Sequence, residues 1–278
     1  MEKRSRLLNI FFVILLIGIA VVFLFPIFIV LMNSFKNKFS ISDAPFTLPN
    51  VDTFAAFENY AEGITATGFP MAFFWSLFVT VLSVGAILLF TSMTAWYIVR
   101  SKDKISKFFY YLLLFSMIVP FQMVMFTMSK TANVLGLDNP LGLVVVYLGF
   151  GAGLSVFMFC GYIKSEPLGI EEAATIDGCN PIQTFFLVVL PLLKPTAITI
   201  AILDTMWIWN DYLLPYLTVG NDYKTIPIAV QYLKGGYGSV DMGAMMAMLV
   251  LSIVPVVLFY LLCQKYIIKG VAAGAIKG

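Results

Sequence analysis

The chain has 278 residues, of which 60% are hydrophobic and only 12% are charged, and its mean hydropathy is +0.94. Soluble globular domains do not reach such values, so the composition indicates a polytopic membrane protein. The net charge of +2 is too small to indicate nucleic-acid binding, and the sequence lacks histidine, the commonest general base and metal ligand. Hydrolytic and metal-dependent chemistry are therefore disfavoured, and we expect no cofactor.

Six apolar runs are long enough to cross a bilayer as helices. In chain order they cover residues 7–32, 73–99, 108–128, 141–162, 196–217 and 243–262. The first run is longer than the core of a signal peptide and no cleavage pattern follows it, so we expect it to remain as a spanning helix. The predicted fold class is an all-α polytopic membrane protein with six transmembrane helices.

Lysine and arginine are concentrated at the N-terminus, at residues 100–107 and at the C-terminus. Cytoplasmic loops carry an excess of these residues, which predicts that both termini lie in the cytoplasm. Residues 1–70 are expected to form an anchor helix and an extracytoplasmic loop. Residues 71–278 are expected to form a core of five transmembrane helices.

Residues 165–181 form a polar segment between the fourth and fifth apolar runs, and this segment is predicted to lie on the cytoplasmic side. Pro167 suits the first turn of a helix, and Gly178 is placed where that helix would stop. Asn180-Pro181 is typical of the start of a second helix. Two short helices are therefore predicted to meet at a bend. One face of the first helix would combine small and apolar side chains with one acid: Ile170, Ala173, Ala174 and Asp177.

Glu171 and Glu172 flank this face and make the loop acidic on a side that is usually basic. We favour the interpretation that a partner protein recognises these charges over the alternative that the loop is merely solvated. Residues 182–190 are too short to cross a membrane and are expected to lie at the interface, before Pro191 and Pro195 break the chain.

The fifth apolar run carries an unusual group of polar and aromatic residues. They are Asp204, Trp207, Trp209, Asn210, Asp211 and Tyr212. Acids within a span usually line cavities or pair with polar groups. The aromatic rings could belong to an interfacial belt, or they could stack on a sugar whose hydroxyls need paired donors and acceptors. Both readings stay open.

Two other spans contain features with a packing alternative. Gln122 follows Pro120 and could line a pore, although helix packing is slightly favoured. Gly149, Gly151, Ala152 and Gly153 form a small-residue patch that close helix contact explains. No nucleotide-binding or nucleophile-elbow motif occurs in the sequence, so any ATP that drives this protein is expected to bind another chain.

These residues together resemble the MalG-like permease subunits of ATP-binding-cassette sugar importers of the carbohydrate-uptake class. The most specific part is the stretch from Glu172 to Gly178, followed by Leu190-Pro191 and Pro195, which is similar to the family's EAA loop. Supporting matches are residues 117–120, 136–142, 209–212 and 270–278. Cys179 and Trp75 depart from the family's common residues.

The resemblance implies a multi-pass permease of the bacterial cell membrane, with the type I importer architecture. A cytoplasmic coupling loop at about residues 165–195, the EAA loop, would contain a helix that docks on an ATPase. The residues assigned to this coupling are Glu171, Glu172, Ala173, Ala174, Asp177, Gly178, Pro191 and Pro195. The resemblance also implies partners: a homologous MalF-like permease, two ATPase subunits and an extracytoplasmic sugar-binding protein. The alternatives are an ion-coupled secondary transporter that uses Asp204 or Asp211, and a membrane enzyme or assembly factor.

Overall fold

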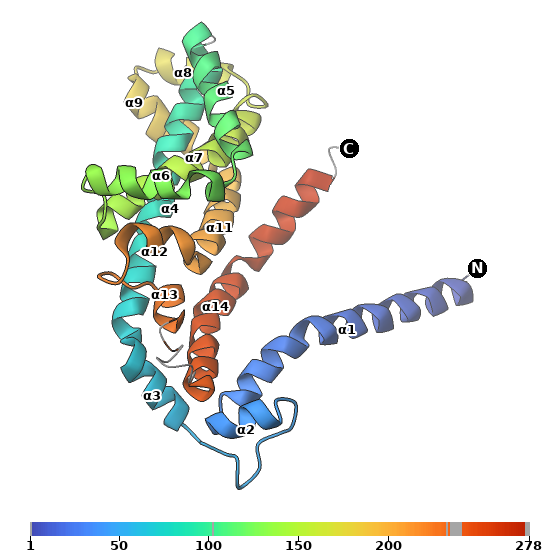
Figure 1. The fold of residues 1–278 in the computed structure, drawn as a ribbon. Helices are drawn as coiled ribbons and strands as arrows, with labels where there is room; N and C mark the ends of the chain where they lie inside the picture. Colours follow the sequence, from blue (N-terminus) through green and yellow to red (C-terminus); the bar gives the residue numbers. More distant parts are fainter. Residues whose placement is uncertain (1, 102, 232, 234–240, 276–278) are drawn as a thin grey trace. The chain divides into compact units, whose positions relative to one another are not determined.

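A computed structural model describes residues 2–101, 103–231, 233 and 241–275, and all the regular structure within these residues is helical. The elements of Figure 1 are α1 (Glu2–Asn33), α2 (Lys38–Asp43), α3 (Glu58–Thr67), α4 (Phe69–Ser101), α5 (Lys104–Ile118), α6 (Phe121–Val134), α7 (Pro140–Ile163), α8 (Gly169–Ile176), α9 (Pro181–Thr184), the π-helical η1 (Phe185–Val189), α10 (Leu190–Leu192), α11 (Lys194–Asn210), α12 (Leu213–Val219), α13 (Ile226–Gln231) and α14 (Met242–Ala275). The predicted all-α class is confirmed.

Four described helices are long and apolar enough to cross a membrane: Leu8–Asn33 of α1, α4, α7 and Met242–Tyr266 of α14. Two further pairs satisfy the same criteria only when their two helices are taken together. These pairs are α5 with α6, bent by 109°, and Pro181–Leu192 with α11, bent by 74°. The described chain therefore has four to six candidate spans.

The single helix predicted over residues 108–128 is wrong, because the chain turns sharply at Val119 and Pro120. Val119 is extended, with φ −78° and ψ 113°, as the residue before a proline tends to be. Pro120 is also extended and precedes α6. Gln122 consequently lies in the first turn of a new helix and not beside a mild kink.

The helix predicted over residues 196–217 ends early, at Asn210. Asp211 is extended, and its Oδ1 accepts a hydrogen bond from the N–H of Leu213 at 3.0 Å. This carboxylate therefore satisfies a free N–H at the start of α12. The break predicted at Pro191 and Pro195 is found between them: Pro191 lies in α10, Pro195 lies in α11, and the chain bends by 74° at Leu193.

The chain divides into two compact units. One comprises Met1–Pro70 with Ala229–Pro255, and the other comprises Met71–Ile228 with Val256–Gly278. In the first unit, the buried Asn59 side chain donates to the carbonyls of Ser34 at 2.8 Å and of Lys36 at 2.7 Å. Lys36 is itself only 1% exposed and donates to the Ala44 carbonyl, and burial lowers the pKa of its ammonium group.

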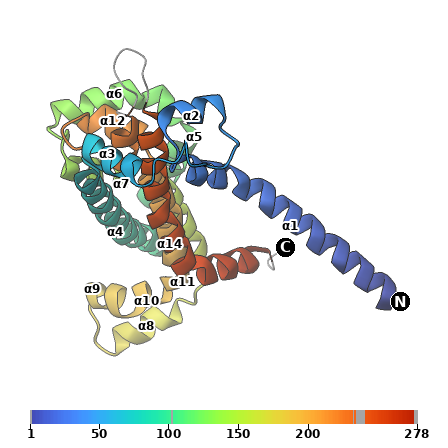
Figure 2. The same cartoon turned by 90° about the horizontal axis from the view of Figure 1, so that it is seen from below.

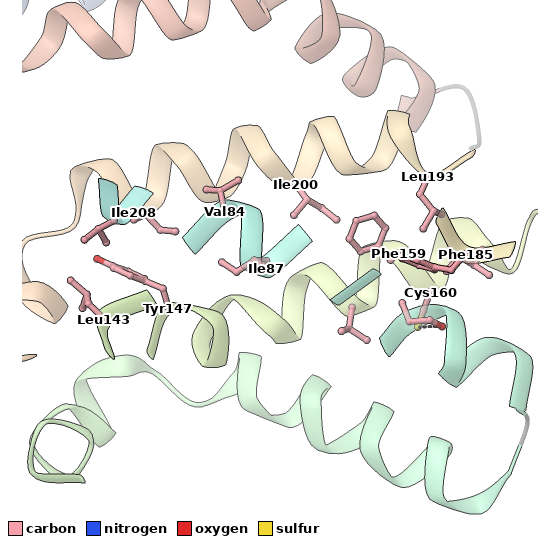
Figure 3. Close-up of a cluster of buried hydrophobic side chains, with 14 of the residues drawn as sticks. Val84, Ile87, Leu143, Tyr147, Phe159, Cys160, Phe185, Leu193, Ile200 and Ile208 are labelled. Atoms are coloured by element: carbon pink, nitrogen blue, oxygen red, sulfur yellow. Dashed lines mark hydrogen bonds between the residues drawn. The ribbon is translucent and has the colours of Figure 1, made fainter. Parts of the chain in front are cut away.

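In the second unit, α7 packs against α5, α11 and α12. The shared hydrophobic cluster extends from Leu143, Tyr147 and Ile208 at one end to Phe159, Phe185 and Leu193 at the other (Figure 3). A side chain at Gly151 would collide with Ile87, and one at Gly153 would come 2.8 Å from the Leu113 carbonyl. The packing interpretation is confirmed for these two glycines. It is wrong for Gly149, where an added Cβ would meet no atom within 4 Å.

Candidate functional site

The polar segment folds as two short helices joined by a tight turn. α8 ends at Ile176, and Gly178 follows with a φ of +92°, a conformation that side chains with a Cβ rarely adopt. The N–H of Cys179 reaches back to the Ala174 carbonyl at 3.0 Å. Asn180 and Gln183 then form a reciprocal capping box with Pro181 at the first helical turn. The predicted stop and start are therefore confirmed, whereas Pro167 precedes α8 instead of lying in its first turn.

Glu171 is bound to the end of α4, through residues that the sequence alone did not single out. Arg100 donates to its Oε1 from Nε at 2.9 Å and from Nη2 at 2.7 Å, and Trp96 Nε1 donates to Oε2 at 2.8 Å. The Arg100 and Glu171 side chains are only 21% and 12% exposed. Charge-assisted bonds with this degree of burial are among the stronger polar contacts in proteins, so α8 is fastened to α4.

Three of the four predicted face residues are exposed, and one is buried. Ile170, Ala173 and Asp177 are exposed, as is Glu172, while Ala174 is buried. Ile176 and Ile182, which the sequence analysis did not select, are 86% and 68% exposed. Together they give the segment an outward surface that is part apolar and part acidic.

A cleft of about 230 Å³ adjoins this surface, and Glu172 belongs to both. Its lining residues come from α4, α8, α9 and the segments beside them: Trp96, Leu168, Glu171, Glu172, Thr175, Cys179, Pro181 and Thr184. The Trp96 ring is 5.7 Å from the ring of Phe185, which is buried in the core. Figures 1 and 2 show α8 and α9 together at one end of this unit, away from α6 and α12.

The continuous helical stretch after the turn carries the polar segment into the core. Phe185, Val189 and Leu193 are buried, while Pro191 and Pro195 are exposed. The π-helical turn η1 and the 74° bend redirect the chain into α11. Residues 182–190 are therefore a core-packed arm, with Ile182 and Leu187 on its outer side.

The polar residues of the fifth apolar run do not all face the same way. Asp204 is 3% exposed and accepts a hydrogen bond from Ser155 Oγ at 3.4 Å. Trp209 is 8% exposed and packs edge-on against Phe73, with ring centres 5.8 Å apart. These two residues face the interior of the unit.

A second group forms around Tyr147. Its hydroxyl donates to Asp211 Oδ2 at 3.1 Å, and its ring meets Trp207 edge-on at 5.4 Å. Trp207 is 40% exposed, and the exposed Asn210 donates to the Met206 carbonyl at 2.7 Å. The Tyr212 ring stacks on Tyr216 at 5.2 Å. The sequence analysis missed Tyr147 because it lies on another helix.

Gln122 is exposed on α6. In the described part of the chain, no group of three or more Cys, Asp or Glu side chains is placed to hold a metal ion.

Comparisons with known proteins agree on one family. Residues 87–273 match the family described as "Binding-protein-dependent transport system inner membrane component". The chain is 37% identical over 262 residues to the "Probable starch degradation products transport system permease protein AmyC" of Thermoanaerobacterium thermosulfurigenes, covering 94% of each chain. It is 34% identical to the multiple sugar-binding transport system permease protein MsmG of Streptococcus mutans, covering 99% of this chain and 100% of that protein.

A solved structure is also similar. It is that of a bacterial ABC transporter involved in the import of the acidic polysaccharide alginate, with a TM-score of 0.78, 26% identity and coverage of 94% of this chain and 97% of the other. The family match spans more than half of the chain, and it includes the polar segment and the polar part of α11. The chain therefore belongs to the family of binding-protein-dependent transport system inner membrane components.

Proposed function

We propose that this chain forms half of the translocation path of an ATP-driven importer of oligosaccharides. Relatives named for starch degradation products, multiple sugars and melibiose/raffinose/stachyose support a carbohydrate substrate. The family consists of transport permeases of the inner membrane, so the chain is a transport protein and not an enzyme. ATP hydrolysis takes place in a separate subunit.

In this proposal the chain has six spans, with each bent pair counted as one, and both termini lie in the cytoplasm. Residues 1–70 supply the anchor and the extracytoplasmic loop, and residues 71–278 supply the permease core. The basic stretch at residues 100–107 supports this orientation. The proposed partners are a homologous MalF-like permease, two ATPase subunits and an extracytoplasmic sugar-binding protein.

The observation that carries the coupling part of the proposal is the attachment of α8 to α4 through Glu171, Arg100 and Trp96. A helix that is exposed on one side and fastened on the other can pass on a displacement. We assign docking on the ATPase to Glu172, Ala173 and Asp177, which are exposed. Buried Ala174 lets α8 lie close to its support, and Glu171 is a positioning residue.

The rest of the segment would convert the displacement of α8 into movement of a span. Gly178 forms the turn that reverses the chain, and Pro191 and Pro195 flank the bend before α11. Because Phe185, Val189 and Leu193 are packed in the core, the arm cannot move without the helices that surround it. The proposed result is a change in which side of the membrane the path faces.

For the path itself we propose two roles. Trp207, Asn210 and Gln122 are exposed and are assigned contact with the solute, together with Tyr212. The second role is to support the surface that contacts the solute. We assign it to Asp204 and Asp211, which accept hydrogen bonds from Ser155 and Tyr147, and to Trp209, which packs against Phe73. Aromatic faces with neighbouring amides suit sugars, whose rings stack and whose hydroxyls form hydrogen bonds.

The coupling proposal is tested by Glu172→Lys and Gly178→Pro. Both are expected to abolish uptake of a radiolabelled oligosaccharide by cells, while membrane fractions hold normal amounts of the chain. Glu62→Lys is the matched control, since it makes the same charge reversal at another exposed position and is expected to leave uptake intact. Normal uptake in both test variants would refute docking through this segment.

A further inference from the structure

A second cavity, of about 600 Å³, opens beside the attachment of α8. It lies where α4 ends, α5 begins and the chain leaves α7. Its lining combines three cations, two phenol rings and an apolar wall: Arg100, Lys107, Lys164, Tyr110, Tyr111, Ile98 and Val99. A cavity of this volume is in the range of small-molecule sites. The proposed function does not use it.

The charges around this cavity are unbalanced. Arg100 is paired with Glu171, which does not line the cavity, and no carboxylate is among the lining residues. Lys107 and Lys164 are both exposed, and Lys164 Nζ lies 5.2 Å from the centre of the Tyr110 ring. The nearby Asp103 accepts the N–H of Ser106 and caps α5. The cavity therefore offers cationic and hydroxyl donors to an anion.

The apolar surroundings indicate that this anion carries hydrocarbon. Phe108, Tyr111, Leu112 and Phe115 follow one another at spacings of three, one and three residues along α5, and they are 63%, 67%, 49% and 61% exposed. They extend from the basic cavity along the outer side of a helix that belongs to a candidate span. A ligand with a charged head and apolar chains would satisfy both parts of this surface.

We propose that the cavity binds the phosphate headgroup of an anionic glycerophospholipid, with the acyl chains along α5. The inference rests on the proposed orientation, which places this end of α4 and α5 in the cytoplasmic leaflet. Basic pockets between transmembrane helices on that side bind anionic headgroups in other proteins. Because Arg100 lines the cavity and also holds Glu171, the bound lipid lies next to the attachment of the polar segment.

The test measures retention of phosphatidylglycerol by the full chain, purified in its assembled complex and examined by native mass spectrometry. The double variant Lys107→Gln/Lys164→Gln removes two cations from the cavity. A basic residue near the membrane surface strengthens binding of anionic lipid about fivefold, so we expect about 25-fold weaker retention. The control Lys104→Gln/Lys194→Gln removes the same charge from exposed residues that do not line the cavity, and it should bind like the parent.

Each outcome decides the proposal. Unchanged retention in the cavity variant, or equal losses in both double variants, would overturn it, since the second result indicates only general surface attraction. Inorganic phosphate at millimolar concentration is the competitor. Displacement of phosphatidylglycerol by free phosphate at that concentration would overturn the lipid as the occupant, whereas retention supports it. The readout is lipid binding, so it is independent of whether the oligosaccharide proposal holds.

Discussion

Single residues of the polar segment act through backbone geometry as much as through chemistry. Gly178 has a φ of +92° and no atom near the position of a Cβ, so a side chain there would meet strain and not a collision. Gly169, at the start of α8, likewise has open space around it but an ordinary φ. Because neither glycine has a neighbour that a Cβ would strike, a comparison of the two isolates the effect of backbone conformation.

We expect Gly178→Ala to reduce uptake, because a left-handed conformation costs a residue with a Cβ about 1–2 kcal/mol. Gly169→Ala should leave uptake unchanged, since alanine favours a helix over glycine. Uptake assays with matched membrane amounts test the pair. If Gly178→Ala were as active as Gly169→Ala, the shape of this turn would not matter for coupling.

Asp204 is the deepest acid of the fifth apolar run, and its bond to Ser155 assigns it a packing role. The side-chain oxygen of asparagine can accept the same hydrogen bond from the Ser155 hydroxyl. We therefore expect Asp204→Asn to change uptake by less than about threefold, which corresponds to a free-energy change under about 1 kcal/mol. Ser155→Ala serves as the second variant in the same assay. Uptake that depends on a proton gradient and is lost in Asp204→Asn would favour an ion-coupled transporter instead.

At the scale of elements, the attachment between α4 and α8 joins residues that are far apart in the sequence. Arg100 and Glu171 are separated by 71 positions, and Trp96 and Glu171 by 75. The Arg100 and Glu171 side chains are both mostly buried, so removing either one leaves the other as a buried charge without its partner. The same contacts place Trp96 between the polar segment and the core ring of Phe185. The two helices are thereby expected to move together.

A double-mutant cycle of Arg100→Met and Glu171→Met measures this coupling. Hydrogen bonds to charged groups contribute about 1.5–3 kcal/mol, and we expect an interaction free energy of that order in thermal unfolding of the complex. Each single variant should also lower uptake. Strictly additive effects of the two changes would mean that the bonds contribute nothing to stability.

At the scale of the whole molecule, the proposed orientation assigns the polar segment and the loop before α3 to opposite sides of the membrane. Ile176 is 86% exposed in the former and Val51 is 97% exposed in the latter. Cys160 is fully buried, so replacing Cys179 and Cys263 by serine is expected to leave a chain without a reactive native thiol.

In that background, Val51→Cys should react with a membrane-impermeant maleimide added to intact cells. Ile176→Cys should react only in inside-out vesicles stripped of the ATPase subunits, which are proposed to cover α8. The reason is that the bilayer excludes the charged reagent. Mass spectrometry of the labelled chain gives the readout. Reaction of Ile176→Cys from outside intact cells would refute the orientation.

The sequence by itself determined the features that depend on local pattern: the all-helical class from the apolar runs, and the turn of the polar segment from Gly178 and Asn180-Pro181. It also determined the family, through motifs spread over most of the chain. Only the tertiary structure decided that Glu171 is bound by Arg100 and Trp96, that the run after Phe108 is bent at Pro120, and that Tyr147 meets Asp211. The physical reason is range. Periodicity and capping act over a few residues, whereas these contacts and the basic cavity exist only once separate helices are packed together.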